Sequence, residues 1–477
     1  MKLITDITEH FVGGVFQPAE GLMIDVFNPA TRQRLASAPD GDQAVVDAAI
    51  GSARSAQPSW ASTPAIERAG YLRKLSAAVR ARADELASLV TLEQGKVKAL
   101  AALEVSLTAE YIDYMAEWAR RIEGEIVTSD RPGEDIFVFR RPLGVVAGIL
   151  PWNFPLFMIA RKMAPALITG NTVVIKPSEE TPLSANAFAK IVAEAALPEG
   201  VFNLVYGGAV TGAALSGHAG IDMVSFTGSS SAGAKIYQQA AANITKVSLE
   251  LGGKAPAIVM DDANVDLAVA ILKASKTVNT GQACHCPERV YVHRQVLAEF
   301  TEKLANEMGS ISYGDALDEL PVEMGPLINA SAVNRIEGLV SDAKSKGAEI
   351  VAGGAVANDQ PGFHFQPSVL AGVDESMDIM QQEVFGPLLM VAAVDSLDEA
   401  ITRANDTNYG LSSSIFTNSL AAAKQACREL AFGETYINRE NFEAIQGFHA
   451  GIKKSGIGGA DGKHGLYEFM STQVVYM

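Results

Sequence analysis

The spacing of apolar residues predicts a helical first third of the chain. Leu72 and Leu75 begin a helical repeat within residues 66–93, and residues 43–56 and about 98–122 share this periodicity. We therefore expect three long helices ahead of the first buried strands.

The pattern changes to alternation over residues 123–141, which predicts a hairpin. Beyond it, short apolar strands alternate with helices, beginning with a strand over 143–150 and a helix over 157–169. This order predicts a mostly parallel sheet with right-handed crossovers. A second series of the same kind runs from about 265 to 440, and residues 472–476 form a terminal strand. The predicted fold class is α/β, with two large domains and a small β appendage.

Composition excludes several classes of function. The 477 residues include 38 Lys and Arg against 55 Asp and Glu, a net charge of −17, which argues against a nucleic-acid partner. A hydrophobic share of 48% indicates an ample core. Prolines and Asn153 interrupt the uncharged run over 142–160, so we expect a buried strand and helix and no membrane span. Only three cysteines are present, which excludes a disulfide framework and favours a reducing, cytoplasmic location.

The first turn of the predicted parallel sheet lacks the glycines of the usual dinucleotide motif. That motif reads G-x-G-x-x-G, whereas residues 150–155 read Leu-Pro-Trp-Asn-Phe-Pro. Glu179, after the second strand, is a candidate acceptor for ribose hydroxyls. Residues 226–233 open a helix with small side chains, and free N–H groups at such a place suit a phosphate. The same residues also fit an ordinary glycine-rich turn with serine caps.

Residues 281–286 read Gly-Gln-Ala-Cys-His-Cys and carry a second chemical signal. A metal site is disfavoured, because zinc sites pair such ligands with a second cluster that the chain lacks. A buried inert thiol is another interpretation. The third is a nucleophile, for which Glu250 is a candidate base and Asn153 a candidate oxyanion partner. Spacing alone does not bring these residues together.

Six motifs in a fixed order decide among these interpretations. They are Pro-Trp-Asn-Phe-Pro at 151–155, Lys-Pro-Ser-Glu at 176–179, Phe-Thr-Gly-Ser at 226–229, Glu-Leu-Gly-Gly-Lys at 250–254, Gly-Gln-Ala-Cys at 281–284 and Glu-Val-Phe-Gly-Pro at 383–387. Together they resemble the NAD(P)-dependent aldehyde dehydrogenase superfamily over essentially the whole chain. A glycine-free first turn is typical of that family.

The resemblance implies catalytic roles for three residues. Cys284 is expected to attack the aldehyde as a thiolate. The side-chain amide of Asn153 and the backbone N–H of Cys284 are expected to form the oxyanion hole. Glu250 is expected to activate the water that hydrolyses the resulting thioester.

The resemblance also implies a cofactor site. Glu179 favours NAD over NADP, because a carboxylate beside the ribose accepts from a 2′-hydroxyl but repels a 2′-phosphate. The residues implied to bind the cofactor are Trp152, Lys176, Ser178, Glu179, Gly228, Ser229, Gly233, Arg335, Glu383 and Phe385.

Four polar residues are implied to line the substrate pocket, namely Arg161, His285, Glu443 and His449. The stretch 438–451 resembles the bacterial members that act on lactaldehyde and glycolaldehyde, so we expect a small α-hydroxy aldehyde as substrate. His285 departs from those members, in which an asparagine follows the nucleophile. The alternatives are an acid semialdehyde such as succinate semialdehyde, whose dehydrogenases share Arg161 and Cys286, and an internal Arg161–Glu443 ion pair without a substrate role.

The resemblance finally implies a domain organisation and a homo-oligomer. Residues 1–122 and 142–250 are expected to form the NAD-binding domain, and residues 251–455 the catalytic domain. Residues 123–141 and 456–477 are expected to form the oligomerisation segment of a dimer or tetramer. A non-catalytic member recruited for binding is disfavoured, because the nucleophile, the base and the oxyanion residue are all present.

Overall fold

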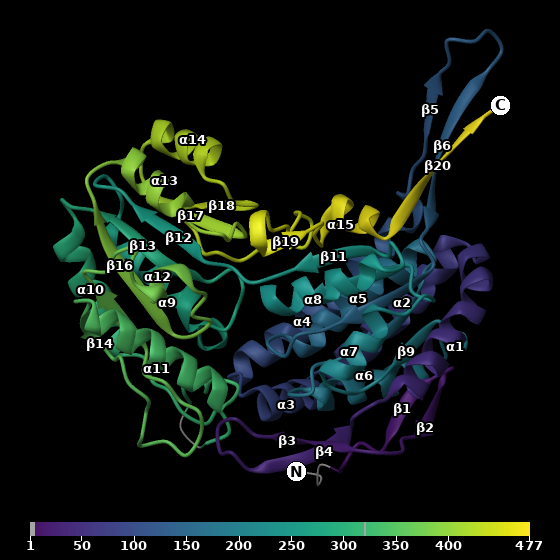
Figure 1. Ribbon diagram of the computed structural model, residues 1–477, viewed down its shortest axis with the longest axis horizontal. Coiled ribbons are helices and arrows are strands. Elements are labelled where there is room, and N and C mark those ends of the chain that lie inside the picture. The colour runs from purple at the N-terminus through teal and green to yellow at the C-terminus, as the bar shows by residue number, and fades with distance from the viewer. Residues whose placement is uncertain (1–4, 319–320) are drawn as a thin grey trace.

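Two β-sheets and a projecting β arm organise the chain (Figure 1). The computed structural model describes residues 5–318 and 321–477. Within these residues the first sheet has eight strands. Their spatial order is β19 (Gly456–Ile457), β11 (Lys246–Glu250), β10 (Met223–Thr227), β7 (Val145–Ile149), β8 (Thr172–Lys176), β9 (Phe202–Leu204), β1 (Glu9–Val12) and β2 (Val15–Pro18).

The second sheet has seven strands within the described ranges. Their order is β14 (Glu349–Ala352), β15 (Ser368–Ala371), β16 (Leu388–Val394), β13 (Pro287–His293), β12 (Ala255–Val259), β17 (Ser412–Phe416) and β18 (Glu434–Ile437). Neighbours pair in parallel in both sheets except at the edges, where β19, β1, β2 and β14 run antiparallel. The predicted α/β class is therefore confirmed.

Helices cover both faces of the first sheet, because alternate strand residues point to opposite cores. Val146 and Val173 pack against one helical layer, and Val145 and Val174 pack against another. The helices of this lobe are α1 (Gln43–Ser62), α2 (Ala65–Ala81), α3 (Ala83–Gln94), α4 (Lys98–Ala116), α5 (Pro155–Thr169), α6 (Pro182–Glu194), α7 (Ala209–Ser216) and α8 (Ser230–Ala241).

The second lobe repeats this layering. Tyr291 of β13 faces one core, whereas Val290 and Val292 face the other. The helices of this lobe are α9 (Val265–Thr277), α10 (Leu297–Gly309), α11 (Ala330–Ser345), α12 (Asp378–Gln381), α13 (Leu397–Asn405) and α14 (Leu420–Glu429).

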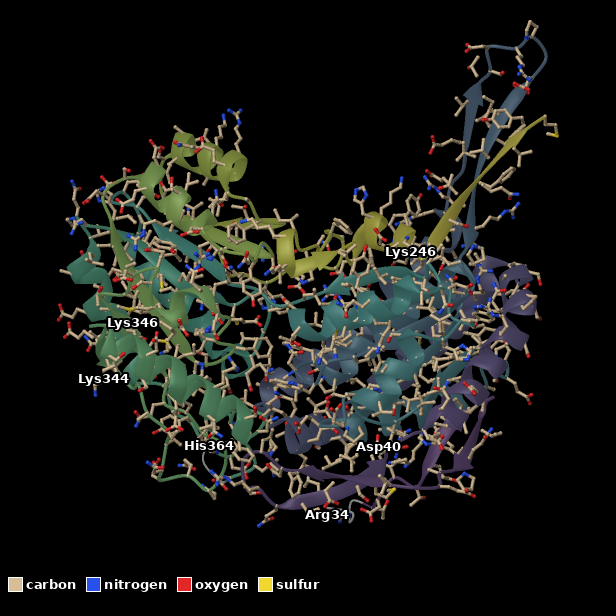
Figure 2. The ribbon with its side chains drawn as sticks, viewed as in Figure 1. Arg34, Asp40, Lys246, Lys344, Lys346 and His364 are labelled. Carbon is tan, nitrogen blue, oxygen red and sulfur yellow. The ribbon has the colours of Figure 1, made fainter. Side chains whose placement is uncertain are left out.

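The arm consists of β5 (Glu125–Thr128), β6 (Asp135–Pro142) and β20 (Met470–Tyr476), paired antiparallel. It confirms the predicted hairpin and terminal strand, and it projects from the first lobe (Figure 1). The short helix α15 (Gly462–Glu468) precedes β20. Near the base of the arm, the Nζ atom of Lys246 (labelled in Figure 2) lies 3.1 Å from a carboxylate oxygen of Glu468. Because β19 pairs with β11 in the first sheet, β20 is the strand of 456–477 that pairs within the arm.

Two predictions for the first third were wrong. The helix expected over 66–93 is broken at Arg82, whose φ of −113° separates α2 from α3. The structure also places β1, β2, β3 (Met23–Phe27) and β4 (Arg34–Pro39) ahead of the first helix, where no strand was expected. Strands of four to six residues at a sheet edge carry too short an apolar pattern to be recognised.

A buried ion pair fixes the beginning of α5. Glu104 accepts hydrogen bonds from the backbone N–H groups of Leu156 (2.9 Å) and Phe157 (3.2 Å). The Nζ atom of Lys96 donates to Glu104 (2.5 Å) and to the carbonyl oxygen of Asn153 (2.8 Å). A carboxylate is favourable at a helix N-terminus, where N–H groups lack intrahelical partners. The pair therefore sets the position of the turn before α5.

We predict that Glu104→Ala destabilises the fold by about 3–5 kcal/mol, because it leaves Lys96 charged and unpaired in the core. Denaturant unfolding followed by circular dichroism measures the loss. The exposed Glu117→Ala, just beyond the same helix, should change stability by no more than about 0.5 kcal/mol. Equal losses in both variants would contradict the role of the buried pair.

Candidate active site

A cavity of about 650 Å³ lies where the turns after the parallel strands of the first lobe meet loops of the second. Ligands in open α/β sheets bind at this carboxyl edge. The cavity gathers twelve of the residues expected at the catalytic and substrate sites or along the cofactor. These are Trp152, Asn153, Arg161, Gly228, Ser229, Glu250, Cys284, His285, Arg335, Glu383, Phe385 and Glu443.

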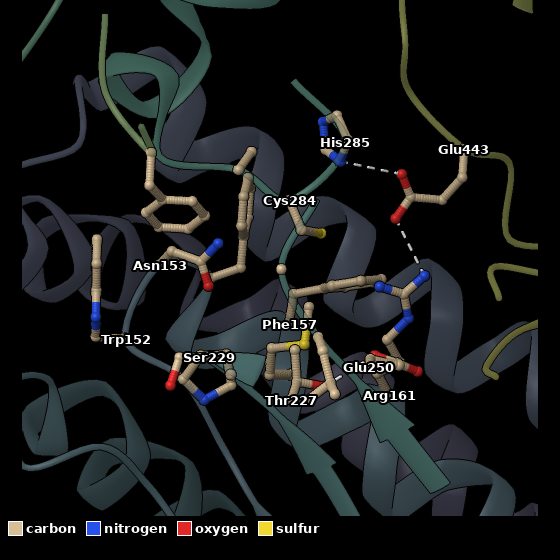
Figure 3. A pocket seen from close by; sticks show the side chains of 18 of the residues that line it. Trp152, Asn153, Phe157, Arg161, Thr227, Ser229, Glu250, Cys284, His285 and Glu443 are labelled. Atoms are coloured by element: carbon tan, nitrogen blue, oxygen red, sulfur yellow. Dashed lines mark hydrogen bonds and ion pairs between the residues drawn. The ribbon is translucent and has the colours of Figure 1, made fainter. Parts of the chain in front are cut away.

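Cys284 sits on a backbone that is locally strained. Asn279 and Thr280 have φ of 49° and 61°, values that are rare for residues other than glycine. Gly281 follows with φ of 70°, and a Cβ atom there would lie 2.2 Å from the carbonyl oxygen of Gly386. The turn therefore requires glycine, and it delivers the Cys284 thiol into the cavity (Figure 3).

Asn153 is tied to the same turn. Its Nδ2 atom donates to the carbonyl oxygen of Gln282 at 3.0 Å, and Asn279 donates through its own amide to the Asn153 carbonyl oxygen at 3.0 Å. The carboxamide is buried and lines the cavity together with Cys284. The side-chain amide of Asn153 is therefore an N–H donor in the same cavity as the thiol, and an oxyanion formed there requires such a donor.

Glu250 ends β11 and faces the cavity with one oxygen unused. Its Oε2 accepts from the Thr227 hydroxyl (2.8 Å) and lies 3.1 Å from the Nζ atom of Lys162. Its Oε1 is buried without a hydrogen-bond partner. Burial opposes ionisation, but Lys162 and Arg161 outweigh it and lower the pKa of Glu250 to about 2. The carboxylate is thus ionised, held as an anion, and has Oε1 free to accept from water.

Arg161 is paired with two carboxylates. Its guanidinium donates to both oxygens of Asp461, with one distance of 3.0 Å, and to Glu443 at 3.1 Å. The Nδ1 atom of His285 lies 3.4 Å from the second oxygen of Glu443, so that His285, Glu443 and Arg161 form a continuous row (Figure 3). The internal Arg161–Glu443 ion pair is therefore present, and Asp461 completes it.

Cys284 has an imidazole beside it. The Nε2 atom of His449 lies 3.9 Å from the Cys284 sulfur, and His449 Nδ1 lies 3.0 Å from Glu434. Burial opposes ionisation of the thiol, but hydrogen bonds with His285 and His449 outweigh it and lower the pKa of Cys284 to about 7. Cys286 is different, since burial raises its pKa to about 12 and its sulfur donates to a backbone carbonyl.

Aromatic and acidic residues form the cofactor end of the cavity. The rings of Trp152 and Phe385 meet edge to face with centroids 5.6 Å apart. Glu383 accepts from the N–H of Gly253 at 2.8 Å, and burial raises the pKa of Glu383 to about 8. Arg335 donates to the backbone carbonyl of Glu383 at 2.8 Å, so it positions this segment.

The residues expected at the adenosine end lie around the carboxyl end of β8, outside the cavity lining. Lys176 donates to the carbonyl oxygens of Pro177 and Gly207 and lies 3.7 Å from the exposed carboxylate of Glu179. Ser178 accepts from the N–H of Glu180.

The first turn of α8 is built for close approach of the backbone. Ser229 caps this helix by accepting from the N–H of Ala232 at 3.2 Å. A Cβ atom on Gly233 would lie 2.5 Å from Leu251, so glycine lets α8 pack against the loop after β11. A Cβ atom on Gly228 would lie 2.4 Å from the ring of Phe226. Free N–H groups and small residues here fit a phosphate.

Sequence reasoning missed Lys162, Asp461 and Glu434. Arg161 and Lys162 are the two charges in an otherwise apolar helix, and buried charges require partners, so the sequence indicates that carboxylates lie beside them without identifying Asp461. Glu434 carries no comparable signal.

No group of three or more His, Cys, Asp or Glu residues in the described part of the chain is placed to hold a metal ion. No helix among the residues that the structure describes is long and apolar enough to cross a membrane.

Comparison with known proteins is consistent with this geometry. The model of the aldehyde dehydrogenase family matches residues 16–475. A lactaldehyde dehydrogenase of Escherichia coli (strain K12) is 55% identical over 98% of both chains, and an NADP-type succinate-semialdehyde dehydrogenase of the same strain is 40% identical over 96% of this chain and 94% of its own. A crystal structure of lactaldehyde dehydrogenase from Escherichia coli superposes with a TM-score of 0.98 at 55% identity and covers 99% of each chain.

We predict that iodoacetamide alkylates Cys284 with a rate that rises through a pH of about 7, because only the thiolate reacts and its fraction falls below that pH. Peptide-resolved mass spectrometry of the native protein measures the rate at each pH. Exposed Cys427 provides an internal reference, and buried Cys286 should stay unmodified. A Cys284 profile that follows Cys427 would contradict the lowered pKa.

Proposed function

The chain belongs to the aldehyde dehydrogenase family, and from this we infer that it oxidises a small α-hydroxy aldehyde, lactaldehyde or glycolaldehyde, to the carboxylic acid. The relative at 55% identity is named for lactaldehyde. As a member of the family the chain is an oxidoreductase acting on aldehydes. Its choice of substrate is the part that the pocket has to explain.

The pairing of the Arg161 guanidinium with two carboxylates is the observation that carries this proposal. An acid semialdehyde carries a carboxylate besides its aldehyde group, and that carboxylate needs an unpaired cation in the pocket. Arg161 already donates to Asp461 and Glu443, and it is 2% exposed. Freeing it would leave a buried carboxylate unpaired, a cost of several kcal/mol. A neutral hydroxyl needs only a hydrogen-bond partner, which Glu443 or His285 offers at the cavity wall.

The proposed chemistry begins at Cys284. Its thiolate attacks the aldehyde carbonyl carbon, and the amide of Asn153 with the backbone N–H of Cys284 stabilises the negative oxygen. A bound nicotinamide dinucleotide supplies the hydride acceptor, which leaves a thioester on the sulfur. Glu250 then takes a proton from water through its free Oε1, and the hydroxide displaces the thiolate to release the acid.

We propose NAD as the cofactor, within a family that uses NAD or NADP. Trp152 and Phe385 bound a slot at one end of the cavity, and the α8 N-terminus offers N–H groups to a pyrophosphate. Glu179 supports NAD over NADP, because its carboxylate accepts from a ribose hydroxyl and repels a phosphate. Lys176, at 3.7 Å, orients that carboxylate.

We propose that the arm joins copies of this chain into a dimer or tetramer. Its strands expose apolar side chains, with Ile126 at 73%, Val474 at 46% and Tyr476 at 65%. Exposed apolar residues on an edge strand favour association. We also propose that the lobe of the first sheet is the NAD-binding domain and that the lobe of the second sheet is the catalytic domain. A cytoplasmic location belongs to the same proposal, because a catalytic thiol needs a reducing compartment.

Absorbance of the reduced cofactor at 340 nm tests the substrate and cofactor together. With NAD, lactaldehyde and glycolaldehyde should exceed succinate semialdehyde in kcat/KM by at least about tenfold, since freeing one buried ion pair costs more than ~1.4 kcal/mol. The same assays with NADP should be slower. A higher kcat/KM for succinate semialdehyde would overturn the substrate proposal.

The role of Glu250 predicts a distinctive kinetic defect. Glu250→Gln should still transfer hydride and give one burst of NADH per active site, because the amide cannot take a proton from water. Steady-state turnover should fall by about 10²–10⁴-fold. Stopped-flow absorbance separates burst from steady state. Cys284→Ala, the matched control, should show neither phase, and an unchanged steady state in Glu250→Gln would refute the assignment.

A further inference from the structure

His449 lies against the sulfur of Cys284 and not in the wall of the cavity. It is 1% exposed and is not among the lining residues in the described part of the chain. Its backbone is fixed, since its N–H donates to Ala460 and its carbonyl accepts from the same residue, both at 2.9 Å. The imidazole therefore has a defined position 3.9 Å from Sγ. This contact makes a hydroxyl-binding role for His449 the weaker assignment.

Glu434 holds the other side of the same ring. Its Oε1 lies 3.0 Å from His449 Nδ1, and its Oε2 accepts from the Tyr436 hydroxyl at 2.8 Å. Glu434 begins β18, and its backbone N–H donates to the carbonyl oxygen of Leu411. A carboxylate on Nδ1 fixes the proton there, which leaves Nε2 facing the thiol as an acceptor. His449 and Glu434 are thus each held in place by contacts of their own.

We propose that Cys284, His449 and Glu434 form a relay that prepares the nucleophile of the proposed dehydrogenase. The S–H bond of Cys284 breaks, its proton forms an N–H bond at His449 Nε2, and the electron pair stays on sulfur. The product is a thiolate paired with an imidazolium, which Glu434 stabilises through Nδ1. His449 touches the reacting atom and is a catalytic residue. Glu434 acts through it and is a positioning residue.

The charges around His449 favour its protonated form. Burial opposes protonation, but Glu443 from the same loop and Glu434 from β18 outweigh it and raise the pKa of His449 well above its usual value. Arg161 of α5 opposes them. These carboxylates therefore stabilise the imidazolium that forms when the proton moves from Cys284 to His449. His285, next to Cys284, is a second imidazole and the competing explanation for a reactive thiol.

Further groups complete the surroundings of this cluster. They are Glu250 of β11, whose pKa is lowered in part by His449, and Asp461, whose pKa is raised by burial although His449 opposes that shift.

The test is the pH profile of Cys284 alkylation in variants of the full chain, a readout that needs no aldehyde or cofactor. His449→Asn should move the midpoint upward by at least one pH unit, toward the ~8.5 of a free thiol. Glu434→Gln should move it in the same direction, and Glu434→Asp should restore it. Glu440→Gln removes an exposed carboxylate that pairs only with Arg439 and should leave the midpoint unchanged.

Two results would overturn the relay. One is an unchanged midpoint in both His449→Asn and Glu434→Gln. The other is a shift that appears only in His285→Asn. Near-UV circular dichroism of each variant establishes that the fold is retained, and the Glu434→Asp rescue keeps the test decisive if Glu434→Gln unfolds. The substrate assays on the unaltered protein fail or succeed independently, since alkylation reports on the thiol alone.

Discussion

Two adjacent cations on a fully buried helix are the constraint from which the site follows. Every residue of α5 is buried, and Arg161 and Lys162 are 2% and 1% exposed. Buried charges of this kind require carboxylates at hydrogen-bond distance. Asp461, Glu443 and Glu250 meet that requirement from three different segments. The helix therefore acts as the fixed centre to which the C-terminal loops and β11 attach.

The same electrostatics reaches the nucleophile in steps. His449, His285 and then Arg161 outweigh the burial of Glu443 and lower its pKa, and Glu443 in turn raises the pKa values of the two imidazoles beside Cys284. Those imidazoles in turn lower the pKa of the thiol. Arg161 therefore has two opposing effects, since it helps to keep Glu443 ionised but opposes protonation of His449. Loss of Arg161 would then alter reactivity as well as packing.

The sequence predicted the site residues better than their partners. Asn153, Glu250 and Cys284 could be placed in one site through the resemblance of their motifs to the family, whereas spacing alone did not bring them together. Asp461 and Glu434 could not, because the turns that bring them to Arg161 and His449 leave no periodic pattern. The break at Arg82 was hidden for a related reason, since the residues on either side of it continue the helical spacing. The α/β class, the arm and the family were all confirmed.

The arrangement also explains how a pocket rich in charge can suit a neutral substrate. Its cations and anions are matched inside the protein, with Arg161 on Asp461 and Glu443, and Lys162 on Glu250. These side chains therefore offer hydrogen-bonding groups to the cavity, while the positive charges among them are paired with carboxylates. His285 extends the row by one titratable ring, at 3.4 Å from Glu443. Glu443 compensates the positive charge of a protonated His285. A substrate hydroxyl can therefore accept a hydrogen bond from His285 without having to neutralise that charge.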